Sequence, residues 1–297
     1  MIKKMHLKIL FLLRCILVLT TACILVEFYV SKNNQCDGPS SVFELDESSN
    51  TDTEVLQGLL SGEMDALDPK LLEFVRHRLL YAPSLGPRRL KRPNTLDYSH
   101  SGQSKVVDTF LHQRRHGFFV EAGAWDGEKT SNSLFFEKSR NWTGILVEPD
   151  PENFEKLVRK NRKAFVVQSC LTSKPIWLDF TLSSRADAGA INPINKNRPI
   201  RGTTRLLCLP IQTLLSTIGR THVDFFSLDI EGAELEVLQA FPWDKITVDM
   251  WTVEVHRLSE NYSQALIDIR GVFTRTGMYK EVEPRGQDLL FVRQDIH

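Results

Sequence analysis

The sequence lacks an excess of charge of either sign, because 37 lysines and arginines balance 37 aspartates and glutamates among its 297 residues. Proteins that bind nucleic acid through its phosphates carry a basic patch or stripe, and no lysine and arginine stripe of that kind occurs here. We therefore predict no nucleic-acid partner. Internal repeats are also missing, and 42% hydrophobic residues suffice to bury the core of one sizeable domain.

Cysteine is scarce, with five residues, and none stands at the short spacings that hold a metal ion. The sequence accordingly predicts no metal site. Cys15 and Cys23 lie in an apolar N-terminal segment, which leaves Cys36, Cys170 and Cys208 for the rest of the chain. A Cys170–Cys208 disulfide is one pairing that three cysteines allow, and the pairing stays open at this point.

An apolar run from Ile9 to Val26 is close to the roughly 20 residues that a membrane-spanning helix needs. Arg14 interrupts the run, but a dozen strongly apolar residues offset its cost of about 2.5–3.5 kcal/mol. Because lysines precede the run, we predict a cytoplasmic N-terminus at residues 1–8 and a transmembrane signal-anchor at residues 9–29. A cleaved signal peptide is the alternative, although no small residues follow the run at a cleavage site.

This topology predicts a single-pass type II membrane protein of the endoplasmic reticulum or Golgi, with the endosome or plasma membrane as alternatives. The lipid bilayer is then one partner of the chain, and everything after the anchor faces the lumen or the outside. Glycosylation sequons begin at Asn141 and Asn261, which agrees with a luminal domain. Asn261 is the better candidate, because Asn141 adjoins a predicted buried strand.

Residues 30–100 predict a luminal stem and linker that contains helices. Its first part is polar, and leucines and valines then recur at helical spacing from Thr53 to Tyr81. Pro83 to Pro93 form an extended basic connector, which is either a solvated strap over the domain or a partner-binding patch. We place the globular domain at residues 101–297.

Buried strands alternate with helices through this domain, which is typical of a parallel sheet with helices on both faces. The expected strands cover residues 118–120, 144–148, 164–168, 223–229 and 247–256, and 176–182 form a hairpin arm. Two last strands, 279–282 and 289–292, form a hairpin across Gly286. The sequence thus predicts an α/β fold, a doubly wound, mostly parallel sheet with a C-terminal antiparallel hairpin, preceded by one transmembrane helix.

Acidic residues follow the ends of these strands. Glu121 ends the first strand, Glu148 the second and Asp229 the fourth. The carboxyl ends of parallel strands line one crevice of a doubly wound sheet, so we expect these acids to lie close together. A carboxylate about 20–25 residues beyond a glycine loop suits a ribose diol, because it accepts both hydroxyl protons; Glu148 has that spacing from Gly123.

The remaining candidates flank these acids. Gly123 and Gly127 form the turn after the first strand, where backbone N–H groups face a ligand. The list is completed by an acidic turn that holds Glu231 and Glu234 after Asp229, and by Glu254 and His256 after the next strand. Each acid alone is explained by a helix cap or a solvated strand end, but their joint placement favours a binding site.

Over residues 101–293 the chain resembles the FkbM-type S-adenosylmethionine-dependent methyltransferases. The resemblance rests on the segments 118–127 (FFVEAGAWDG), 131–132 (SN), 142–148 (WTGILVE), 224–234 (DFFSLDIEGAE) and 253–256 (VEVH). It implies a sheet of the Rossmann-like methyltransferase type. Within the family the chain looks most like the membrane-anchored, Star-like members, with a short cytoplasmic N-terminus, one anchor and this domain in the lumen.

The resemblance also assigns roles. Glu121, Gly123 and Gly127 would hold the methionine part of S-adenosyl-L-methionine, and Glu148 its ribose. Asp229 would hold the cofactor amine or the acceptor. The acceptor side would be lined by acids, bases or metal ligands: Glu231, Glu234, Glu254 and His256. Asp229, Glu231 and His256 are the candidate catalytic residues, with His256 the natural base.

Two functions follow from the resemblance. In the first, the domain recognises a membrane-tethered epidermal-growth-factor-receptor ligand precursor or another secretory client and escorts it from the endoplasmic reticulum to the Golgi. In the second, it methylates an oxygen of a sugar or another small acceptor. Two positions depart from the usual enzyme pattern: Trp125 stands where a glycine is usual, and residues 168–170 offer no acid for the adenine amine.

Overall fold

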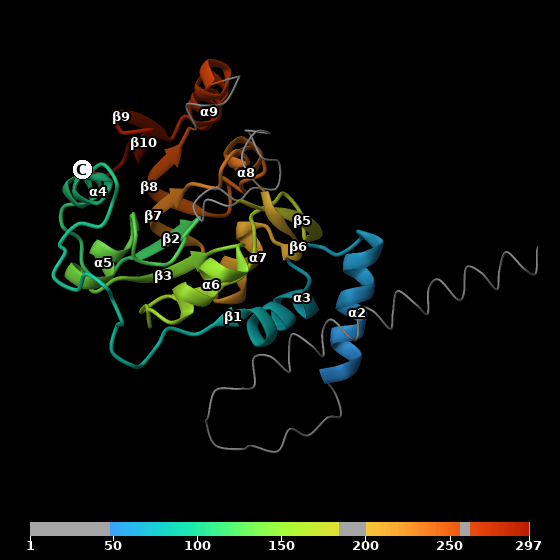
Figure 1. Cartoon of the computed structure of the whole chain (residues 1–297). Coiled ribbons are helices and arrows are strands. Elements are labelled where there is room, and N and C mark those ends of the chain that lie inside the picture. The colour runs from blue at the N-terminus through green and yellow to red at the C-terminus, as the bar shows by residue number, and fades with distance from the viewer. Residues whose placement is uncertain (1–47, 184–199, 256–261, 297) are drawn as a thin grey trace, which may run out of the picture. The chain divides into compact units, whose positions relative to one another are not determined.

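The computed structural model describes residues 48–183, 200–255 and 262–296 (Figure 1). The predicted cytoplasmic segment and the transmembrane helix at residues 9–29 lie outside these ranges. Within them, no helix is long and apolar enough to cross a membrane. The fold below is therefore that of the compact unit that begins near Glu47.

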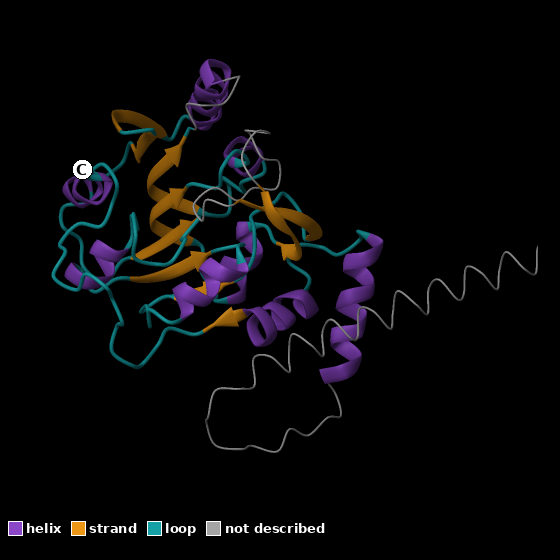
Figure 2. Cartoon of the chain, viewed as in Figure 1, coloured by secondary structure: helices purple, strands orange, loops and turns teal. Residues whose placement is uncertain are grey.

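An eight-stranded sheet forms the centre of the unit (Figure 2). Five strands run parallel in the order β4-β3-β2-β7-β8, which is the doubly wound order with its crevice at the carboxyl ends. Their bounds are Phe165–Val167 (β4), Thr143–Val147 (β3), Phe118–Ala122 (β2), His222–Leu228 (β7) and Thr247–Glu254 (β8). The predicted mostly parallel sheet is confirmed.

Antiparallel strands close both edges of the sheet. The C-terminal hairpin is formed by β9 (Tyr279–Arg285) and β10 (Asp288–Arg293), and β10 inserts between β8 and β9. The predicted hairpin is therefore confirmed, with its second strand next to the parallel ones. At the other edge the two-residue β1 (Leu80–Tyr81) pairs with β4.

Two apolar cores lie on opposite faces of the sheet, because successive strand residues point to opposite sides. Phe119, Phe225 and Met250 belong to one core, and Phe118, Phe226 and Trp251 to the other. The first core is covered by α4 (Gln103–Phe110), α5 (Leu134–Ser139) and α6 (Pro151–Val158). The second is covered by α2 (Ser48–Ser61), α3 (Pro69–Phe74), α7 (Ile211–Thr217), α8 (Glu234–Gln239) and α9 (Tyr262–Thr276).

Part of the predicted stem belongs to the globular unit. Val55 of α2 and Leu71 of α3 are fully buried in the second core, and the helical turn η1 (Val75–Leu79) leads directly into the sheet strand β1. The compact unit thus begins well before residue 101, since the apolar stripe of the stem helices is buried against the sheet rather than left along a linker.

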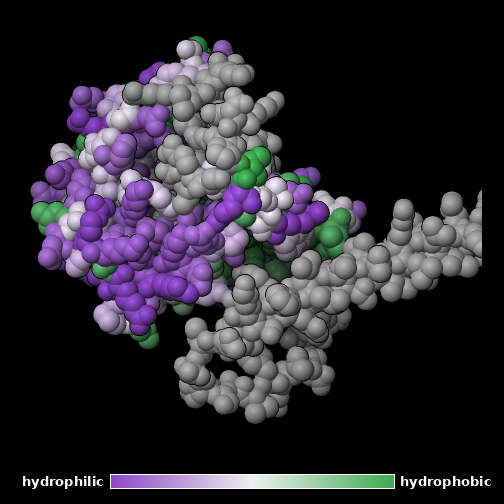
Figure 3. Space-filling view, viewed as in Figure 1, coloured by the Kyte–Doolittle hydropathy of each residue, from purple (hydrophilic) through white to green (hydrophobic). Residues whose placement is uncertain are grey.

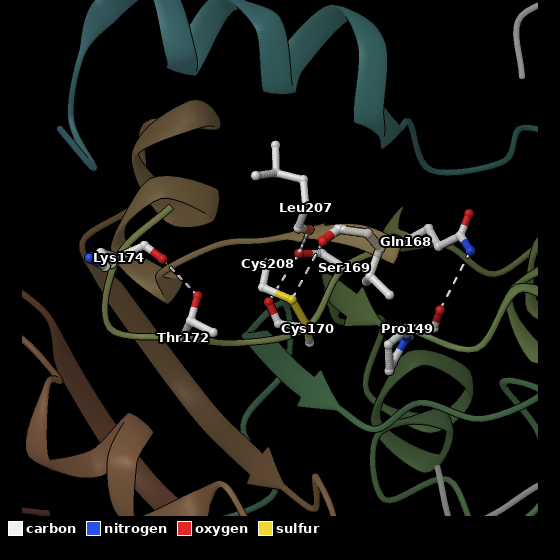
Figure 4. Close-up of a disulfide and its surroundings, with 9 residues drawn as sticks. Pro149, Gln168, Ser169, Cys170, Thr172, Lys174, Leu207 and Cys208 are labelled. Carbon is white, nitrogen blue, oxygen red and sulfur yellow. Dashed lines mark hydrogen bonds between the residues drawn. A yellow bond between two sulfur atoms is a disulfide. The ribbon is translucent and has the colours of Figure 1, made fainter. Parts of the chain in front are cut away.

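A small second sheet contains β5 (Ile176–Ser183) and β6 (Ile200–Cys208), which confirms the predicted hairpin arm. Cys170, just after β4, forms a disulfide with Cys208 at the end of β6 (Figure 4). The Ser169 hydroxyl also donates to the carbonyl of Leu207 at 2.9 Å. The arm is thereby fixed to the end of β4, and the pairing that the sequence left open is settled.

Candidate functional site

The carboxyl ends of β2 and β7 meet at Gly123. The Gly123 N–H donates to the Val147 carbonyl at 3.0 Å, and the Asp229 N–H donates to the Ala122 carbonyl at 3.1 Å. Gly123 has a φ of +84°, and a Cβ on it would lie 1.8 Å from the Asp229 carbonyl oxygen. Only glycine allows this approach, which brings the loop after β2 against the acidic turn after β7.

Glu121 holds that loop from inside. Its buried carboxylate accepts hydrogen bonds from the Asn132 N–H at 2.7 Å, the Ser131 hydroxyl at 2.9 Å and the Ser133 hydroxyl. Burial raises the pKa of Glu121, while the nearby Arg162 guanidinium and these hydrogen bonds oppose that rise. All three hydrogen bonds run to the turn before α5, so in this geometry Glu121 shapes the loop around the predicted cofactor.

Glu148 lies at the end of β3, as the sequence predicts, and joins the loop to α6. Its two carboxylate oxygens accept from the Trp125 N–H at 2.7 Å and the Asp150 N–H at 3.0 Å. The side chain is buried, and burial raises its pKa to about 8. The Asn153 side chain also hydrogen-bonds to Glu148. With this pKa the group is a carboxylic acid at neutral pH, which keeps one O–H donor and further acceptor lone pairs, so it can still pair with a ribose diol.

Asp229, Glu231 and Glu254 come together at the ends of β7 and β8. One carboxylate oxygen from each lies within 4.8 Å of the others, a spacing at which the three could hold a metal ion. Burial and the charges of Glu254, Glu231 and Asp288 raise the pKa of Asp229 well above its ordinary value. A cation near Asp229 would relieve this repulsion, and the predicted absence of a metal stays a prediction.

Asp288 is a further acid that sequence reasoning missed. It opens β10 and stands opposite Glu254 in the antiparallel register. Its carboxylate accepts from the Gln103 side chain at 2.8 Å, and burial raises its pKa to about 7. The only sequence signal is its position after the Gly286 turn, because the register of the hairpin decides what it faces.

Glu234, predicted on the acceptor side, and Trp125, which stands in place of a glycine, both make contacts within the crevice loops. The Glu234 carboxylate turns back on its own loop and accepts from the Ile230 N–H at 2.9 Å and the Gly232 N–H at 3.0 Å. Burial raises the pKa of Glu234 to about 7. Trp125 contributes its backbone N–H to Glu148, while its ring lies 4.0 Å from the Lys129 ammonium.

Gly127 ends the first turn of the loop with a φ of +74°, and its N–H donates to the Ala124 carbonyl at 2.9 Å. His256 and Asn261, the predicted base and the better sequon, lie outside the described residues. Asn141 is exposed, and its side-chain nitrogen lies 3.0 Å from the His116 Nδ1 atom. Both sequons stay predictions.

A second group with metal-ligand spacing, His222, Asp224 and Asp249, lies at the opposite end of β7 and β8. Hydrogen bonds to Asp224 and Asp249 raise the pKa of His222 to about 9, so its imidazole is protonated near neutral pH. Arg114 already forms ion pairs with both aspartates. A protonated imidazole has no lone pair to offer a metal, and this group is best described as an ion-pair network.

The residues at the crevice fit S-adenosylmethionine by their chemistry. Glu148 offers acceptors for a ribose diol, and the acids around Asp229 complement a ligand that carries a sulfonium and an ammonium group. The buried Asn132 Oδ1 atom beside Glu121 has no hydrogen-bond partner among the described residues. Residues 168–170 after β4 offer no acid, as the sequence indicates.

The strand order and the glycine-linked acidic crevice define a Rossmann-like methyltransferase fold. The family model described as Methyltransferase FkbM domain matches residues 121–278, just over half of the chain. The chain belongs to this family. No curated protein matches it.

Three similar solved structures are distant in sequence. A Pyrococcus furiosus methyltransferase is 14% identical, with 64% of this chain and 82% of that chain covered and a TM-score of 0.33. The human methyltransferase 10 domain containing protein is 11% identical, with 84% and 99% covered and a TM-score of 0.36. The METTL16 MTase domain is 12% identical, with 84% and 92% covered and a TM-score of 0.39. At these TM-scores the likenesses carry no argument.

Proposed function

We propose that this crevice binds S-adenosyl-L-methionine and that the domain transfers its methyl group to an oxygen of a sugar or another small acceptor. The observation that carries the proposal is the meeting of Glu148 and the Asp229–Glu254 pair on either side of Gly123. This edge of a doubly wound sheet is where nucleotide-like ligands bind.

The bound cofactor would supply an electrophilic methyl group on a sulfonium. Glu148 orients the ribose, and Asp229 and Glu254 attract the positive charge and exclude anionic acceptors from the same side. Transfer to a hydroxyl needs alignment and a group that takes the hydroxyl proton. Asp229 suits that role once it is ionised, a state that the positive charge of the bound cofactor would favour. The raised pKa that its neighbours cause makes this ionised form a stronger base than an ordinary aspartate.

Isothermal titration calorimetry of S-adenosylmethionine into the purified full-length chain tests binding. Asp229→Asn keeps the size of the side chain and removes the charge of its ionised form, so the affinity should fall. Asp268→Asn, at a half-buried position of α9, should leave the affinity unchanged. Equal affinities for the wild type and Asp229→Asn would remove Asp229 from the site. Methyl transfer is then assayed with radiolabelled cofactor and a panel of glycosides.

A second proposal keeps the Star-like role, in which a luminal domain escorts a membrane-tethered growth-factor precursor. The Cys170–Cys208 disulfide supports a luminal position, because disulfides persist in oxidising compartments. In this proposal the same crevice is used for recognition. Loss of precursor export in the Asp229→Ala, Glu231→Ala double variant, with the fold intact, would exclude a purely scaffolding role in which the crevice takes no part.

The topology behind the second proposal has its own test. A mobility shift on endoglycosidase treatment that disappears when Asn141 and Asn261 are both replaced would support a luminal domain. Protease digestion of the domain from the cytosolic side of sealed microsomes would exclude the anchor and the escort role together. Methyl transfer by the purified chain would be unaffected by either result.

A further inference from the structure

The loop that forms the crevice, residues 123–133, is held by two carboxylates, Glu128 within it and Glu137 on α5. Both also bind a segment that precedes the family-matched region, the basic strap at residues 83–93. The Lys91 and Arg92 N–H groups donate to Glu128 at 2.8 and 2.6 Å. Arg88 forms an ion pair with Glu137 and donates to its carbonyl oxygen at 3.1 Å.

The turn between α6 and β4 supplies a second set of partners for Glu128 and Glu137. Lys160 forms an ion pair with Glu128, and the fully buried Arg162 donates to Glu137 at 2.7 Å. Each carboxylate therefore joins the strap to this turn. Glu128 belongs to the loop itself, and Glu137 lies on the helix that follows the loop. The Arg89 N–H also donates to the Lys160 carbonyl at 2.8 Å, which fixes strap and turn directly.

Arg162 reaches from this turn into the loop itself. Its guanidinium donates to the Gly127 carbonyl and, at 2.9 Å, to the Ser133 hydroxyl oxygen. The hydroxyl of Ser133 in turn donates its proton to Glu121. Glu121 and Arg162 thus hold the same serine from its two sides, one through the hydroxyl proton and the other through the oxygen.

The network contains a buried charge, the Glu137 carboxylate, which two guanidinium groups neutralise. Glu137 is fully buried, and burial alone would raise its pKa, but Arg162 and Arg88 hold the pKa below its ordinary value. The carboxylate is therefore ionised near neutral pH and depends on both guanidiniums. Removing one partner of a buried ion pair destabilises the fold, because the other charge is left uncompensated. Without Arg88 of the strap, the position of the loop is therefore less stable.

We propose that the strap is a positioning element of the cofactor site, with Arg88 and Arg162 as positioning residues that fix residues 123–133 through Glu137. The proposal rests on the proposed binding of S-adenosylmethionine. The strap does not contact the ligand in this account. It raises affinity because a loop that is ordered beforehand need not be ordered by the ligand.

The test replaces Arg88, which is part-exposed and leaves Arg162 on Glu137, so that the variant still folds. In the full-length chain, Arg88→Gln should raise the dissociation constant of S-adenosylmethionine about tenfold. Hydrogen exchange at residues 123–133 should become faster, while β7 and β8 keep their protection. Arg88→Lys should restore part of both effects. Arg270→Gln, which breaks an exposed bidentate pair with Glu281, is the matched control and should change neither.

Unchanged exchange in the loop of Arg88→Gln would overturn the proposal, and so would faster exchange with an unchanged dissociation constant. If the wild-type chain bound no S-adenosylmethionine, the proposed function would fail by itself. The exchange measurement would then still decide whether the strap orders the loop.

Discussion

The unusual state of Glu148 leads to a stability prediction that needs no ligand. Glu148 lies 5% exposed between the loop and α6, and burial raises its pKa from 4.5 to about 8. Because the folded-state pKa lies above the unfolded one, the folded protein binds an extra proton between these two pH values. Its stability from this group is complete below pH 4.5 and is lost as the pH rises through 8.

The size of the effect follows from the two pKa values. One pKa unit corresponds to about 1.4 kcal/mol, so full ionisation of Glu148 costs the folded state about 4–5 kcal/mol. Glu148→Gln carries no charge at any pH and removes this dependence. The amide also loses one of the two backbone hydrogen bonds, a cost of about 1 kcal/mol that does not change with pH.

Urea unfolding of the wild type and Glu148→Gln, followed by tryptophan fluorescence at pH 5, 6, 7 and 8, measures the difference. We expect the variant to be less stable than the wild type at pH 5. Between pH 5 and pH 8 the wild type should lose several kcal/mol of unfolding free energy relative to the variant. Taking the difference between the two proteins cancels the titration of other acids. A stability difference that stays constant from pH 5 to 8 would refute the reasoning, because Glu148 would then be ionised throughout.

Three further changes test the fold around the site. Gly123→Ala should cost about 3 kcal/mol or more in unfolding free energy, whereas Gly219→Ala, with a similar φ and open space around it, should cost about 1 kcal/mol; equal costs would contradict the close approach of β2 and β7. Replacing Cys170 and Cys208 by serine should lower stability by about 3–4 kcal/mol and make it insensitive to reducing agent. Leu71→Ala should lower the unfolding free energy by about 2–5 kcal/mol. A loss near zero would indicate that α3 is solvated and not packed against the sheet.

The parts of the fold that the sequence predicts are those with a local signal. Strand-length apolar runs predict the parallel strands, and the acids that follow them predict where Glu148, Asp229 and Glu254 lie. The close spacing of Asp229 and Glu254 follows from the neighbouring positions of β7 and β8 in the sheet. Strand periodicity and the parallel-sheet rule together thus account for the crevice.

The remaining features depend on contacts between distant segments. Arg162 follows a helix in a polar turn, where a solvated side chain is the ordinary expectation, yet it is fully buried against Glu137. The spacing of α2 and α3 predicts helices but not the surface that they cover. Asp288 faces Glu254 only because β10 inserts next to β8. No local pattern encodes these pairings.

The central claim is that the crevice around Gly123 binds S-adenosyl-L-methionine. Calorimetric titration of the cofactor into the purified full-length chain tests it most directly. We predict saturable binding at one site per chain, weakened by Asp229→Asn and by Arg88→Gln and unchanged by Arg270→Gln. An absence of binding heat at millimolar cofactor, with the chain folded, would contradict the claim.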